Sequence, residues 1–107
     1  MITNEKQRLL SYIGLARKAG KLICGTDMVC DAIRDGKIKL VVVSDSVSAN
    51  TQKRITNCAK YYNVTLKTAE GITPAELGAA LGKSDMACVG VTDSGFCELI
   101  LGISSRK

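Results

Sequence analysis

The sequence contains no histidine and no tryptophan, and its aromatic side chains are limited to one phenylalanine and three tyrosines. Because histidine is the commonest general base and metal ligand, its absence excludes Ser-His and Cys-His nucleophiles and disfavours a metal site. So few aromatic rings do not make a platform on which successive bases stack. The G-x-G-x-x-G and G-x-x-x-x-G-K-[ST] phosphate loops are missing as well. The sequence therefore predicts a protein that is not an enzyme and has no metal and no cofactor.

Long apolar runs are also lacking. No stretch approaches the roughly 20 apolar residues of a membrane span, and the N-terminal MITNEKQRLL carries charge where a signal peptide needs an apolar core. The number of cysteines is odd and none of them form a C-x-x-C pair, which argues against a disulfide framework or a metal site. They are Cys24, Cys30, Cys58, Cys88 and Cys97. These features predict a cytoplasmic protein with free thiols.

What the sequence does contain is basic charge on a small domain. A chain of 107 residues is long enough for one domain, residues 1–107, that buries roughly 65% of its unfolded surface. Lys and Arg number 15 against 10 Asp and Glu, which gives a net charge of +5. This balance favours a polyanionic partner, and either a large RNA or an anionic membrane surface fits.

Helical and extended patterns alternate along the whole chain. Capping residues and apolar spacing predict helices that begin near residues 4, 26, 50, 73 and 93. Short apolar runs predict strands at 22–24, 40–43, 64–67 and 87–92. Met28, Tyr62 and Ala80 are among the residues expected to face the core, and residues 104–107 are expected to form a frayed basic tail. The pattern predicts an α/β fold, a three-layer α/β/α sandwich with a mostly parallel, alternatively mixed, four-stranded sheet.

The turn Gly25-Thr26-Asp27 precedes the second expected helix. A glycine followed by a capping side chain leaves backbone N–H groups pointing outward, and such a terminus can hold a phosphate or a base edge. The alternative is that this turn is only a well-capped helix start.

A second loop, residues 82–86, should lie at the same edge of the sheet as this turn. Lys21, Lys37, Lys39 and Lys83 could flank a shared groove there and neutralise phosphates. Met86 stands in a polar loop, where an exposed apolar side chain can pack on an unstacked base. The alternatives are that the lysines are merely solvated and that Met86 packs into the core.

An ordered set of segments resembles the ribosomal protein L7Ae/L30e superfamily, and most of all its small bacterial members, which bind kink-turn RNA. The resemblance covers nearly the whole chain. It is carried by residues 15–22 (LARKAGKL), Gly25, residues 32–41 (AIRDGKIKLV), 50–51 (NT), 61–64 (YYNV) and 76–83 (ELGAALGK).

The resemblance implies a non-enzymatic, ribosome-associated RNA-binding protein, monomeric in isolation, that recognises an RNA bend flanked by sheared G·A pairs. In the family, the glycine turn and the start of the second helix contact the G·A pairs, and the loop before the last strand covers a flipped-out base. Together with the flanking lysines, the expected RNA-binding residues are Lys21, Gly25, Thr26, Asp27, Met28, Lys37, Lys83, Asp85, Met86 and Ala87.

Four positions depart from the family pattern, and one of them is Asp35, which stands where a cation is common. Archaeal members have Asn-Glu where this chain has Asp27-Met28, and a lysine where it has Asp31. An aspartate accepts hydrogen bonds from a guanine edge but cannot donate as asparagine does, and Asp31 would repel a phosphate. The departures predict weaker or altered kink-turn binding. They also leave open a rival hypothesis, in which the chain is a protein-interaction module of the same fold with a weakened or lost RNA site.

Overall fold

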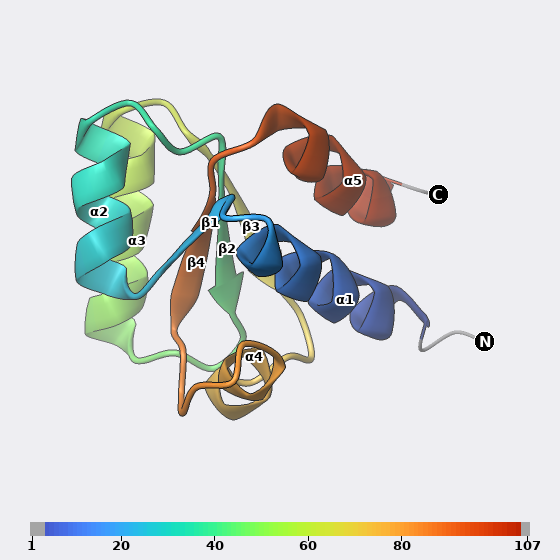
Figure 1. Ribbon diagram of the computed structural model, residues 1–107. Helices are drawn as coiled ribbons and strands as arrows, with labels where there is room; N and C mark the ends of the chain where they lie inside the picture. The colour runs from blue at the N-terminus through green and yellow to red at the C-terminus, as the bar shows by residue number, and fades with distance from the viewer. Residues whose placement is uncertain (1–3, 106–107) are drawn as a thin grey trace.

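Helices and strands alternate in the computed structural model, which describes residues 4–105 (Figure 1). The elements are α1 (Asn4–Lys18), β1 (Leu22–Cys24), α2 (Thr26–Arg34), β2 (Leu40–Ser44), α3 (Ala49–Tyr61), β3 (Thr65–Ala69), α4 (Pro74–Ala80), β4 (Cys88–Val91) and α5 (Ser94–Ser105). The predicted elements are thus confirmed in type and order. No helix within residues 4–105 is long and apolar enough to cross a membrane.

The four strands form one mixed sheet in the order β1-β4-β2-β3. β2 and β3 are parallel, whereas β4 runs antiparallel to both of its neighbours, with Val91 opposite Leu40 on one side and Leu22 on the other. The prediction of a mostly parallel sheet was therefore wrong, and the alternative prediction of a mixed sheet is confirmed. The reason is that α4 has seven residues and spans only about 10 Å. It stays at the edge where β3 ends, so the chain re-enters the sheet in the opposite direction (Figure 1).

Two layers of helices enclose the sheet, as the sandwich prediction required. α2 and α3 cover one face, where Val41 and Val43 pack with Val29, Ile33 and other buried side chains. α1, α4 and α5 contribute to the core on the other face, which contains Leu40, Val42 and Val89. Side chains alternate along β2 and every residue of that strand is buried, because helices cover it from both sides.

Three residues expected in the core are exposed instead. The Met28 side chain is 62% exposed and that of Tyr62 is 41% exposed, and Ala80 also faces solvent. Met28 lies next to the buried stripe of α2 rather than on it, because neighbouring helical residues point about 100° apart. Tyr62 is the C-cap of α3, where the chain already turns toward β3. The frayed tail was expected to begin at residue 104, but α5 continues to Ser105. Residues 106–107 lie outside the described residues.

Candidate nucleic-acid interface

The turn before α2 holds a backbone conformation that only glycine adopts readily. Gly25 has φ 97° and ψ 144° and is the N-cap of α2, and side chains are strained in this region. Its carbonyl accepts a hydrogen bond from Val29 N–H at 2.9 Å. No side chain caps the helix, so the ordinary capped start that the sequence suggested is not present. The first N–H groups of α2 thus lack the partner that a capping residue supplies.

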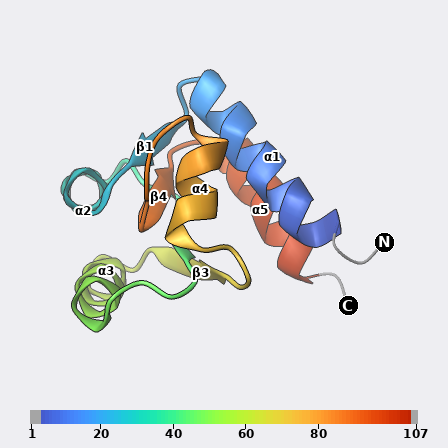
Figure 2. The same ribbon diagram turned by 90° about the horizontal axis from the view of Figure 1, so that it is seen from below.

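The structure brings this turn against the loop between α4 and β4, as the sequence predicted. Gly25 N–H donates to the carbonyl of Cys88 at 3.2 Å, and the Cys88 thiol donates to Thr26 Oγ1 at 4.0 Å. At the same edge the Ala87 carbonyl accepts from Ser44 N–H at 2.8 Å. Figure 2 looks onto this edge and shows the α4–β4 loop passing beside β1. Lys83 and Asp85 are exposed in that loop.

Met86 does not offer its side chain to an unstacked base. The side chain is only 8% exposed and packs with the core residues around Leu77 and Leu81, while Met86 N–H donates to the Pro74 carbonyl at 2.9 Å. The core alternative was therefore right. The exposed apolar side chain at this edge is Met28, in the first turn of α2.

The expected lysine groove is only partly assembled. Lys83 lies at the edge with Gly25, but Lys21 and Lys39 lie at the opposite edge, where Thr92 N–H donates to Lys21 O and Lys39 N–H to Val91 O. Lys37 follows the C-terminus of α2, at that same far edge. Because β1 and α2 each run from one edge to the other, residues before β1 and after α2 cannot flank the turn between them. The prediction that these lysines share one groove was wrong.

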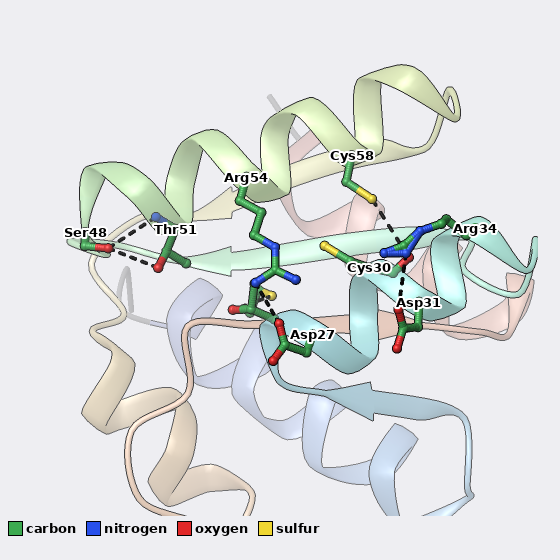
Figure 3. A network of polar contacts seen from close by, with 10 residues as sticks. Asp27, Cys30, Asp31, Arg34, Ser48, Thr51, Arg54 and Cys58 are labelled. Carbon is green, nitrogen blue, oxygen red and sulfur yellow. Dashed lines mark hydrogen bonds and ion pairs between the residues drawn. The ribbon is translucent and has the colours of Figure 1, made fainter.

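A cation that the sequence reasoning overlooked stands beside the turn. Arg54 of α3 pairs with the Asp27 carboxylate at 2.6 Å (Figure 3), and this hydrogen bond is the main reason why the pKa of Arg54 is raised. Both side chains are exposed, so the pair adds little stability. It nevertheless places a guanidinium next to the uncapped helix. Arg54 reaches this position only because α3 packs against α2, a contact that the sequence does not reveal.

Asp31, expected to repel a phosphate, is partly neutralised. Its carboxylate accepts a hydrogen bond from Arg34 Nη1 at 3.2 Å (Figure 3). An exposed pair one helical turn apart is weak, but it reduces the negative charge that α2 presents.

Residues 7–100 match the model of the ribosomal protein L7Ae/L30e/S12e/Gadd45 family. The chain belongs to this family. Among its relatives is the RNA-binding protein YlxQ of Bacillus subtilis, 37% identical over 91 residues that cover 85% of this chain and 89% of the relative. The YlxQ protein of Enterococcus faecium is 35% identical over 92% of both chains. The large ribosomal subunit protein eL30 of Methanosarcina mazei is 31% identical over 79% of both.

Solved structures share the L7Ae-family fold. A protein of unknown function from Bacillus halodurans C superposes with a TM-score of 0.84 at 29% identity, covering 92% of this chain and 98% of its own. The Giardia lamblia 15.5kD RNA binding protein gives a TM-score of 0.73, covering 94% and 84%. At 13% identity, that second likeness concerns the fold alone.

Beneath the turn of this L7Ae-family member lies a buried thiol. Burial raises the pKa of Cys88 to about 11, although the hydrogen bond to Thr26 acts in the opposite direction. All five cysteines are free thiols. Among the described residues, no group of three or more His, Cys, Asp or Glu side chains could hold a metal ion.

The buried thiol predicts a loss of stability in alkali. A raised folded-state pKa favours the neutral thiol, so its contribution is complete below the unfolded value near 9 and declines as pH rises toward 11. At pH 10.5 we expect the unfolding free energy to be about 2 kcal/mol lower on account of Cys88. Urea unfolding at pH 8 and pH 10.5 measures this loss. The Cys88→Ala variant should show a shallower decline; an equal decline in both proteins would contradict the assignment.

Proposed function

We propose that this L7Ae-family protein is a non-enzymatic, cytoplasmic, ribosome-associated RNA-binding protein that acts as a monomer and recognises kink-turn-like RNA. The observation that carries the proposal is the hydrogen bond from Gly25 N–H to the Cys88 carbonyl. It fixes the uncapped N-terminus of α2 beside the exposed α4–β4 loop. Two surfaces from distant parts of the sequence thus form one contact area for RNA.

Each part of this area has a distinct task. The free N–H groups of α2 and the positive end of its dipole attract a phosphate or the edge of a sheared G·A pair. Lys83 and Arg54 neutralise backbone charge on either side. Asp27 accepts from a guanine amino or imino group once Arg54 exchanges its carboxylate partner for a phosphate. Met28, rather than Met86, is the side chain available to pack on an unstacked base.

The relatives support the RNA partner. Two are named as RNA-binding proteins, others are large ribosomal subunit proteins, and the domain carries an excess of basic residues. The departures at Asp27, Met28 and Asp31 concern side chains, whereas the turn that presents the backbone is intact.

The test is a titration of a kink-turn RNA against the same RNA with its G·A pairs replaced by Watson–Crick pairs. We expect at least tenfold tighter binding to the kink-turn. If about four phosphates are contacted, affinity should fall about a hundredfold between 50 and 200 mM salt. Equal affinity for the two RNAs would refute kink-turn recognition. Absence of salt-sensitive binding to either RNA would favour the rival, a protein-interaction module that keeps the fold.

A further inference from the structure

A groove of about 670 Å³ runs between α1 and α4. It is lined by Ser11, Gly14, Leu15, Arg17, Lys18, Ala80 and Leu81. α1 and α4 are close neighbours at this point, since a Cβ on Gly14 would be in ordinary van der Waals contact with the Ala80 carbonyl oxygen, at 3.8 Å. Gly14 and Ala80, the small residues of the lining, leave room for a ligand between the helices.

The lining of the groove suits a polyanion with an apolar component. Two of its seven residues are cations and none is acidic. Leu15, a large apolar residue of the lining, is 52% exposed. A sugar–phosphate backbone presents both features, since phosphates alternate with the less polar faces of ribose. An apolar peptide helix would cover the charges of Arg17 and Lys18 without offering them an anionic partner, and such desolvation is costly.

The groove is continuous with the proposed RNA site. The charges of Arg17 and Lys83 oppose the rise that burial causes in the pKa of Cys24, the residue that directly precedes Gly25. Arg17 Nη1 also donates to the carbonyl of Leu81, the C-cap of α4, from which the α4–β4 loop departs. Figure 2 shows the C-terminal ends of α1 and α4 beside β1 and this loop.

We propose that the bound RNA continues from the Gly25 turn past Lys83 into the α1–α4 groove, where Arg17 and Lys18 bind backbone phosphates and Leu15 contacts ribose. This inference rests on the proposed RNA-binding function and extends its footprint to a second surface. Lys18 is exposed, so its side chain can be exchanged without disturbing the core. It is therefore the residue whose substitution tests the RNA contact. Arg17 has an additional structural task through Leu81.

The test compares Lys18→Glu with Lys60→Glu, a matched exchange of an exposed lysine in the last turn of α3. The probe is a kink-turn RNA with long stems, titrated over a range of salt concentrations. We expect Lys18→Glu to weaken binding about tenfold and to reduce the salt slope by at least about one, as the loss of a phosphate contact requires. Lys60→Glu should stay within about twofold of the wild type. Hydroxyl-radical footprinting should show stem phosphates protected by the wild type and not by Lys18→Glu.

Ala80→Phe supplies a second measurement that leaves every charge in place. A phenylalanine at this exposed position fills the groove, so we expect it to remove the same stem protection while the protection at the kink remains. If both variants bind and protect the long-stemmed RNA as the wild type does, the groove is not part of the footprint, although kink-turn recognition stands. If the wild type itself does not distinguish the kink-turn from its Watson–Crick control, the proposed function fails first.

Discussion

Gly25→Ala should reduce the affinity for kink-turn RNA by at least thirtyfold. The conformation at φ 97°, ψ 144° costs a side chain about 1–3 kcal/mol, so the substituted turn relaxes and redirects the N–H groups of α2. Steric contact does not contribute, since a Cβ there would meet nothing within 4 Å. Titration with the kink-turn RNA measures the loss. Thermal melting should show a decrease in Tm of roughly 4–12 °C for the same strain.

Gly36→Ala is the matched control for that experiment. Gly36 also has a positive φ, 74°, and open space around its Cβ position, but it follows the opposite end of α2. It should lower Tm through backbone strain while RNA affinity changes by less than about threefold. Equal losses of affinity in the two variants would show that the effect of Gly25→Ala arises from general destabilisation, and the assignment of the turn as the RNA contact would be abandoned.

Gly78→Ala should destabilise the domain at least as much as Gly25→Ala, and more than Gly36→Ala or Gly102→Ala. The added Cβ would lie 1.4 Å from the Ser84 carbonyl oxygen and 2.5 Å from the Ser84 carbonyl carbon, and backbone atoms cannot rotate away as a side chain can. The α4–β4 loop must move, and the hydrogen bond from Lys83 N–H to the Gly78 carbonyl at 2.8 Å is strained. We expect a loss of about 3 kcal/mol, at the upper end of overpacking costs, and a decrease in Tm of roughly 12 °C.

Gly102→Ala provides the comparison for Gly78→Ala. It adds the same methyl group in the interior of a helix, but nothing lies within 4 Å of the new atom. Alanine is the better helix former, so this variant should be neutral or more stable by up to about 1 kcal/mol. A Gly78→Ala protein that melts with the wild type would show that the loop has free space at Ser84, and its rigid placement beside Gly25 would need revision.

Local signals in the sequence were sufficient for the type and order of the elements and for several of their starts. Thr73-Pro74-Ala75-Glu76 predicts a helix start, and the structure contains the complete capping box: Thr73 Oγ1 accepts from Glu76 N–H at 3.2 Å and Glu76 accepts from Thr73 N–H at 3.0 Å. The apolar run at β2 predicts a strand covered on both faces, which it is. These signals act within a few residues, and for that reason they can be read without knowing the partners of a segment.

The sequence by itself determined the alternation of helices and strands, the sandwich and the glycine turn before α2. Only the tertiary structure decided that β4 runs antiparallel to its neighbours and that Met28 rather than Met86 is exposed. It also decided that Arg54 pairs with Asp27. Finally, it placed three of the expected lysines at the edge away from Gly25, namely Lys21, Lys37 and Lys39. The physical reason is that periodicity reports which residues share a face, but not which element covers that face. Strand direction, burial and charge pairing depend on contacts between segments distant in the chain, and those contacts exist only once the layers have packed.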